Sequence, residues 1–178
     1  MRGRTEVIIA GLGGQGVVLA GKILGRAAVY DGKRVVQTQS YGAEARGSAA
    51  KGEVIISDER IGFPMVRKCD VLVAMNQNAL DKYLSDLKED GTLLVDQSMV
   101  GEIPKIKARV FMVPATKMAE TKLGSKICAN MIMLGALTKA TGVTSQEAVE
   151  KAITESVSEE ARKVNIKGFR IGLELVKK

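Results

Sequence analysis

Short apolar runs and helical patterns alternate along the first two thirds of the chain. Residues 6–10 are apolar and rich in β-branched side chains, which predicts a strand buried on both faces of a parallel sheet. Residues 11–16 interrupt the run with glycines, and residues 17–30 carry a wide apolar face that predicts a helix ending before Gly32. With residues 34–38 as a second strand, the chain opens as a βαβ unit, whose crossover is right-handed in nearly all proteins.

Four further apolar runs predict strands over residues 52–57, 70–75, 92–96 and 108–113. Asn76 follows the second of these runs, where a helix N-cap is expected. Apolar side chains continue at helical spacing from Ala79 to Leu87, so a helix is predicted there, with Gly91 ending it.

Beyond Pro114 the pattern is entirely helical. Residues 127–137 are apolar on nearly all sides, which is typical of a buried helix. Thr144 and Glu147 have the spacing of a capping box that opens the next helix, and a basic helix closes the chain. The sequence therefore predicts one domain over residues 1–178. Its expected fold is a three-layer α/β/α sandwich with a mainly parallel, Rossmann-like sheet and a helical C-terminal third.

The composition excludes most kinds of active site that this chain could form by itself. The chain has 178 residues, no histidine, no tryptophan and two cysteines. Two cysteines are too few for a disulfide framework or for the four thiolates of an iron–sulfur cluster, and without histidine the commonest general base and zinc ligand are missing. We therefore predict no catalytic and no metal-binding residues. We also expect no membrane span and no signal peptide, and hence a cytoplasmic protein.

The net charge of +7 raises the question of nucleic-acid binding. Much of the excess lies in residues 161–178, which carry six basic side chains and one acidic side chain. No nucleic-acid motif accompanies them, and aromatic residues for base stacking are scarce. A solvated helix face, or a surface for an acidic partner subunit, explains this charge better than DNA binding.

The glycine turn between the first strand and the first helix is the main candidate site. Gly11, Gly13 and Gly16 have the spacing of a dinucleotide- or phosphate-binding loop, in which helix amides face an anion and no Cβ keeps the anion away. A dinucleotide loop also needs an acidic residue at the end of the second strand, and residues 36–40 contain none. NAD binding is therefore disfavoured. The alternative is a tight turn whose glycines serve close packing only.

A second polar loop, residues 41–48, follows the second strand and is expected at the same carboxyl edge of the sheet. Gln15 offers an amide for hydrogen bonding across a crevice at this edge. Arg46 offers a planar fork for a carboxylate or phosphate, or else pairs locally with Glu44 and only shapes the loop. Both interpretations of Arg46 remain open at this point.

The sequence of residues 11–25, GLGGQGVVLAGKILG, followed by residues 36–47, VQTQSYGAEARG, resembles the gamma subunit of 2-oxoacid:ferredoxin oxidoreductases. Residues 54–58, 70–75 and 130–136 resemble it too, so the likeness spans essentially the whole chain. The second loop is more similar to the 2-oxoglutarate branch of that family than to the pyruvate branch. Ser48, where many relatives have glycine, departs from the family pattern.

The resemblance implies a role in the oxidative decarboxylation of a 2-oxoacid with CoA, which gives an acyl-CoA, carbon dioxide and electrons for ferredoxin. It implies thiamine diphosphate and iron–sulfur clusters in partner subunits, namely alpha and beta subunits and a ferredoxin-like subunit, with CoA as co-substrate. The chain itself would have no self-contained active site and would expose an interface, or self-associate, when isolated. The expected contacts to cofactor or co-substrate are Gly11, Gly13, Gly14, Gln15, Gly16, Tyr41, Glu44, Arg46 and Gly47.

Two other functions are compatible with the residues. A freestanding regulatory α/β domain would use the glycine turn to bind a nucleotide, although the second strand lacks its acidic residue. A purely structural module would use the glycines for packing alone.

Overall fold

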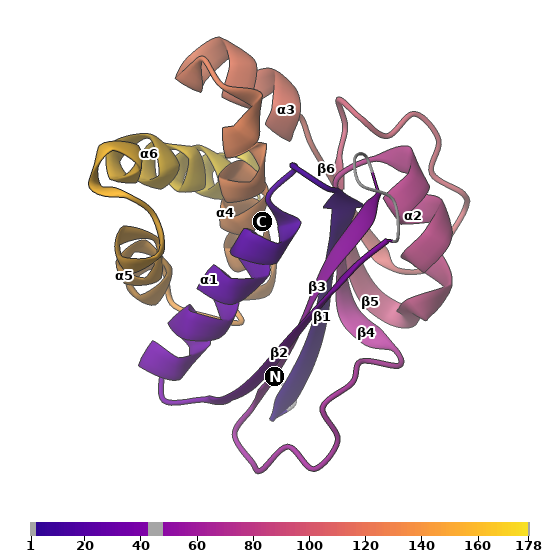
Figure 1. The fold of residues 1–178 in the computed structure, drawn as a ribbon. Coiled ribbons are helices and arrows are strands. Elements are labelled where there is room, and N and C mark those ends of the chain that lie inside the picture. Colours follow the sequence, from indigo (N-terminus) through magenta and orange to yellow (C-terminus); the bar gives the residue numbers. More distant parts are fainter. Residues whose placement is uncertain (1–2, 43–47, 178) are drawn as a thin grey trace.

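Six strands form one continuous sheet in the computed structural model, which describes residues 3–42 and 48–177 (Figure 1). Their order across the sheet is β2-β3-β1-β4-β5-β6. Their bounds are β1 Arg4–Leu12, β2 Arg34–Tyr41, β3 Ala49–Ser57, β4 Cys69–Ala74, β5 Leu87–Asp96 and β6 Arg109–Val113.

The sheet is mainly parallel, as the sequence predicts, but strand β3 runs the other way. Strands β1, β4, β5 and β6 pair in parallel, whereas β3 pairs antiparallel with both β1 and β2. Strand β2 is consequently parallel to β1, with β3 inserted between them. The short connection from β2 to β3 explains the reversal, because a parallel return needs a crossover of a dozen or more residues. All the strands parallel to β1 end at the same edge, which we call the carboxyl edge.

The helices cover the two faces of the sheet unequally (Figure 1). Helices α1, α4, α5 and α6 form a thick layer on one face, and α2 with the loop after β5 covers the other. Their bounds are α1 Val17–Tyr30, α2 Gln77–Tyr83, α3 Ala115–Met118, α4 Ala129–Thr141, α5 Gln146–Ser156 and α6 Glu159–Leu175; 3₁₀ turns span Leu84–Asp86 and Lys126–Cys128, and a π-helical segment spans Ala119–Leu123. The predicted three-layer sandwich is confirmed.

Strand β1 shows why its sequence is apolar without alternation. Val7 and Ile9 pack in the cluster under α1 and α4, while Ile8 and Ala10 pack in the cluster under α2, and all four are buried. Successive side chains of a strand point to opposite faces, so a central strand with both faces covered must be apolar at every position.

Helices α4 and α6 cross at unusually close range. Gly135 on α4 and Gly172 on α6 meet at the crossing, and a Cβ added at Gly135 would lie 3.0 Å from the Cα of Gly172. A Cβ at Gly172 would overlap the carbonyl oxygen of Ile132 and lie 2.9 Å from the backbone nitrogen of Ala136. The two backbones therefore pack against each other directly.

Several predicted boundaries are confirmed and two predictions are wrong. Helix α1 has the predicted bounds, and Asn76 caps α2 by accepting a hydrogen bond from the Ala79 amide at 2.9 Å. The sequence predicts that this helix continues through Leu87 and ends at Gly91, but α2 ends at Tyr83. Leu87 and Gly91 both belong to strand β5. The pairing of β4 with β5 is irregular there, and a Cβ at Gly91 would lie 3.0 Å from the carbonyl oxygen of Asp70. Gly91 thus allows a close approach of two strands.

The second wrong prediction concerns the start of α5. Ser145, and not Thr144, is the N-cap, because its hydroxyl accepts from the Ala148 amide at 3.2 Å and also bonds the Asp31 carboxylate at 2.6 Å. The Thr144 hydroxyl is buried and has no hydrogen-bond partner in the described structure. Among the described residues, no helix has both the length and the apolar character that crossing a membrane requires.

Replacing Gly172 by alanine should destabilise the fold by about 2 kcal/mol or more, because a rigid backbone, and not a flexible side chain, occupies the space of the new Cβ. Urea unfolding measures the free energy. Gly101→Ala is the matched control, since a Cβ at Gly101 meets no atom within 4 Å, and its effect should stay within about 0.5 kcal/mol. Equal stability of the two variants would contradict direct backbone packing of α4 on α6.

Candidate functional site

The glycine turn and the second loop meet at the carboxyl edge, as predicted. The Gly13 amide donates to the carbonyl oxygen of Ser48 at 2.8 Å, and the Gly42 amide donates to that of Ala49 at 2.7 Å. The pairing follows from the sheet, because Leu12 of β1 and Tyr41 of β2 flank the first residues of β3. The described ends of the second loop, residues 41–42 and 48, therefore lie beside the glycine turn.

Gln15 is a brace within the protein. Its side-chain oxygen accepts from the Leu12 amide at 2.7 Å and from Nδ2 of Asn76 at 2.7 Å, and its Nε2 donates to the carbonyl oxygen of Met75 at 3.2 Å. The amide thus joins the ends of two adjacent strands, β1 and β4. A Cβ at Gly11 would lie 2.6 Å from the Gln15 oxygen, so Gly11 is required for Gln15 to fold back over the strand. Both ends of the Gln15 carboxamide are therefore hydrogen-bonded within the protein.

Gly16 forms the N-cap of α1 and is held by Asn130 of helix α4. Its φ of 71° lies in the left-handed region, which favours glycine. The Nδ2 of Asn130 donates to the carbonyl oxygen of Gly16 at 3.1 Å, and a Cβ at Gly16 would overlap this amide group. Both the backbone conformation and the close approach of Asn130 therefore exclude a side chain at position 16.

A cavity of about 350 Å³ opens beside the turn. The polar groups among its lining residues are the backbone of the turn, the ammonium of Lys22 and the phenol of Tyr41, and the other side chains that line it are apolar. The lining residues are Leu12, Gly13, Gly14, Gly16, Val17, Val18, Leu19, Lys22, Tyr41 and Ala50. We call this cavity the notch. The first amides of α1 lack intrahelical acceptors and carry the positive end of the helix dipole, so the notch is suited to an anionic group.

The predicted site residues separate into three groups. Gly13, Gly14, Gly16 and Tyr41 line the notch. Gly11 and Gln15 lie behind the turn and support it. Glu44, Arg46 and Gly47 lie outside the described residues, so the predictions made for them stay predictions.

Lys22 is a lining residue that the sequence reasoning missed. It lies one turn after Val18 on the same face of α1, and among the described residues it forms no ion pair. Its i, i+4 spacing from the first turn could have identified it, because residues at that spacing share a helix face.

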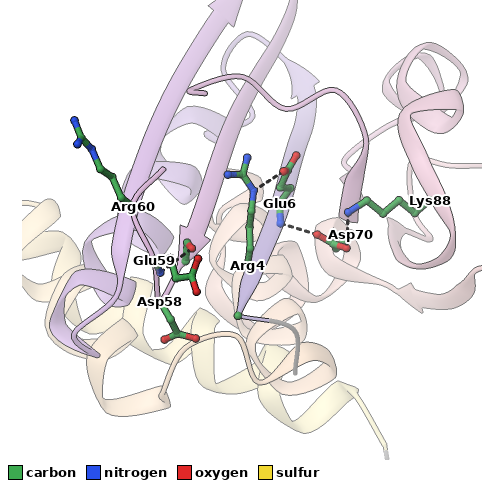
Figure 2. A pocket seen from close by; sticks show the side chains of 9 residues that line it. Arg4, Glu6, Asp58, Glu59, Arg60, Asp70 and Lys88 are labelled. Atoms are coloured by element: carbon green, nitrogen blue, oxygen red, sulfur yellow. Dashed lines mark hydrogen bonds and ion pairs between the residues drawn. The ribbon is translucent and has the colours of Figure 1, made fainter. Parts of the chain in front are cut away.

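A larger cavity, of about 620 Å³, lies at the opposite edge of the sheet (Figure 2). Its charged side chains are largely paired: Arg4 contacts Glu6 at 2.8 Å, and Lys88 contacts Asp70 at 2.8 Å. Figure 2 shows the Arg60 side chain directed away from these pairs. Mutual neutralisation leaves this cavity without a clear preference for a charged ligand.

The two cysteines cannot jointly hold a metal cluster. Cys69 belongs to the core cluster on the α2 face and Cys128 to the cluster on the opposite face of the sheet. Burial raises the pKa of the Cys69 thiol to about 12, which keeps it protonated at neutral pH. In the part of the chain that the structure describes, no three metal-ligating side chains converge.

Comparison with known proteins gives matches over nearly the whole chain. Residues 6–175 match the family model described as pyruvate ferredoxin/flavodoxin oxidoreductase. The 2-oxoglutarate synthase subunit KorC of Methanocaldococcus jannaschii is 49% identical over 177 residues, covering 98% of this chain and 95% of the relative. The corresponding subunit of Methanothermobacter marburgensis is 52% identical over 180 residues and covers 97% of each.

Two solved structures have similar folds. The gamma subunit of the keto/oxoacid ferredoxin oxidoreductase from Geobacter sulfurreducens superposes with a TM-score of 0.86 at 45% identity, over 96% of this chain and 97% of that one. A 2-oxoglutarate:ferredoxin oxidoreductase from Magnetococcus marinus, with 2-oxoglutarate, coenzyme A and succinyl-CoA bound, has a TM-score of 0.89. At 23% identity, with 98% of this chain matching 31% of that chain, it shows a shared fold.

Gln15→Ala should destabilise the isolated chain by about 1–3 kcal/mol, because it leaves partly buried donors and an acceptor around the turn unpaired. The midpoint of urea unfolding measures the change. Gln39→Ala, an exposed glutamine on edge strand β2, is the matched control and should change stability by less than about 0.5 kcal/mol. A Gln15 variant as stable as the Gln39 variant would show that the brace contributes nothing.

Proposed function

The chain belongs to the pyruvate ferredoxin/flavodoxin oxidoreductase family, and we propose that it is the gamma subunit of an enzyme whose 2-oxoacid is 2-oxoglutarate. That it is a subunit of a 2-oxoacid:ferredoxin oxidoreductase follows from its relatives. The observation that carries the choice of 2-oxoglutarate is the near full-length match to 2-oxoglutarate synthase subunits, at 49% and 52% identity. Residues 1–178 would form a single gamma-type domain.

The proposed reaction converts 2-oxoglutarate and CoA into succinyl-CoA and carbon dioxide. The two electrons released pass to two molecules of ferredoxin. Thiamine diphosphate, when bound to its own subunits, would supply the carbanion stabilisation that decarboxylation needs. The cysteines of this chain, which lie on opposite faces of the sheet, do not fit an iron–sulfur cluster. We therefore assign the clusters and thiamine diphosphate to the alpha, beta and ferredoxin-like subunits.

The contribution of this chain would be to hold an anion at the carboxyl edge. The notch combines the first amides of α1 with Lys22, and Arg46 follows in the sequence shortly after Tyr41, which lines the notch. A phosphate of CoA and a carboxylate of the 2-oxoacid are the two anions that the reaction provides. None of the groups in the notch needs to exchange a proton, so its role is binding and orientation.

Exposed apolar side chains at several points support a partner interface. Ile127 is 70% exposed and Tyr41, in the wall of the notch, is 60% exposed. Met99 and Met112 are also exposed. Interfaces of permanent complexes are more apolar than ordinary surface. We expect the subunits that bind thiamine diphosphate to cover part of this surface, and the isolated chain to self-associate without them.

The isolated chain should show no turnover, whereas the complex reconstituted with its partner subunits should reduce ferredoxin with 2-oxoglutarate and CoA. Dye reduction measures both. In the complex, 2-oxoglutarate should give a higher kcat/KM than pyruvate. Sustained turnover by this chain alone would contradict the assignment as a subunit, and tight binding of AMP or NAD by the isolated chain would favour the nucleotide-binding alternative.

In the reconstituted complex, Lys22→Ala and Arg46→Ala should each raise KM for the anion in the notch about tenfold, which corresponds to about 1.4 kcal/mol. An increase for CoA alone places its phosphates in the notch, and an increase for 2-oxoglutarate alone places the carboxylate there. Lys105→Ala, at the opposite edge, is the matched control and should leave both KM values unchanged. Unaltered KM values in both notch variants would leave only the packing role of the glycines.

A further inference from the structure

We propose that Asn130 is a positioning residue for the notch, acting through the peptide group that joins Gly16 to Val17. This inference rests on the proposed function of the notch and identifies the residue that orients its donors. Asn130 lies on helix α4, far from the glycine turn in sequence, and it does not line the notch.

The contact between Asn130 and the turn is specific and buried. The side chain is 3% exposed and donates from Nδ2 to the Gly16 carbonyl oxygen at 3.1 Å. Its Oδ1 accepts from the Met131 amide at 2.8 Å. With both ends of the amide engaged, the side chain has a defined orientation, and the missing Cβ of Gly16 provides the space for it.

The hydrogen bond is not needed to satisfy the Gly16 carbonyl. That oxygen already accepts the Ala20 amide at 3.0 Å, which is the first bond of helix α1. A second donor therefore restricts the direction of the carbonyl and does not rescue a buried unpaired group. This distinguishes orientation from simple satisfaction of a polar atom.

Fixing this carbonyl also fixes a donor of the notch. A trans peptide group is planar, so its N–H points opposite to its C=O. When Asn130 and Ala20 hold the Gly16 carbonyl along the helix, the Val17 N–H must point out of the helix N-terminus. Gly16 and Val17 both line the notch, so this N–H would be available to an anion bound there.

The opposite side of the turn is held in an equivalent way. The Gln15 side chain accepts hydrogen bonds from the Leu12 amide and from Asn76. Two carboxamide side chains from different parts of the sequence, those of Gln15 and Asn130, therefore hold the turn from the side of the protein. Gly14, by contrast, has no atom within 4 Å of its missing Cβ and faces open space. The turn is therefore rigid toward the protein and open toward a ligand, which is the arrangement expected of a preorganised binding site.

The test uses the reconstituted complex with CoA and 2-oxoglutarate as the measured substrates. Asn130→Asp keeps the shape of the side chain and the bond from the Met131 amide, but it replaces the donor to Gly16 with a negatively charged oxygen. Asn130→Ala removes both bonds without adding a charge, so it decides whether a raised KM comes from the lost donor. We expect each variant to raise KM for the anion in the notch about fivefold while kcat changes less than about twofold.

Asn165→Ala is the matched control. Asn165 also donates its side-chain amide to a backbone carbonyl, that of Ala161 at 2.8 Å, but within α6. Loss of this bond should alter stability without altering either KM. A purely structural role for Asn130 predicts the same pattern, namely a lower unfolding midpoint with unchanged KM values, and that result would overturn the proposal.

The Lys22 and Arg46 variants distinguish a failure of the positioning role of Asn130 from a failure of anion binding in the notch. If they raise KM and the Asn130 variants do not, the notch binds an anion but Asn130 does not position its donors. If none of the four variants raises KM, the proposed function of the notch fails. If neither Asn130 variant assembles into the complex, the side chain serves folding, and the positioning role is rejected.

Discussion

The peptide group between Gly16 and Val17 is the point on which the rest of the site depends. Its carbonyl begins helix α1 and accepts a second hydrogen bond from Asn130, and the two residues that it joins both line the notch. Glycine is required at position 16 because the backbone is left-handed and the Asn130 amide occupies the space of a Cβ. A change at this position would therefore alter the helix start, the contact with α4 and the binding surface together.

The position of Asn130 in turn depends on how α4 packs. The backbones of α4 and α6 are in direct contact at Gly135 and Gly172. Because packed elements transmit strain, a side chain added at either glycine is expected to displace α4 and, with it, Asn130. Helix α6 contributes no residue to the lining of the notch, but it packs directly on α4, whose Asn130 bonds to Gly16.

The chemistry of this subunit is consistent with its lack of histidine. The groups that line or support the notch are backbone amides, carboxamides, a phenol and an ammonium, which offer hydrogen-bond donors and a positive charge. The family assignment places the reacting centre in a complex to which this chain belongs. A subunit that contributes orientation and electrostatic complementarity needs a rigid turn, and the amide braces on both sides provide it.

The sequence by itself determined the strands buried on both faces, the bounds of α1, the meeting of the two loops and, through the motifs in those loops, the family. These properties depend on local periodicity and on glycine spacing, which are visible in one stretch of chain. Only the tertiary structure decided that β3 is inserted antiparallel between β1 and β2, that Leu87 lies in a strand, and that Ser145 is a cap. It also decided that Gln15 supports the turn from behind and that Asn130 holds Gly16. Hydrophobic periodicity reports that a residue is buried, but the partner against which it packs is set by contacts between distant segments, and those exist only once the chain has folded.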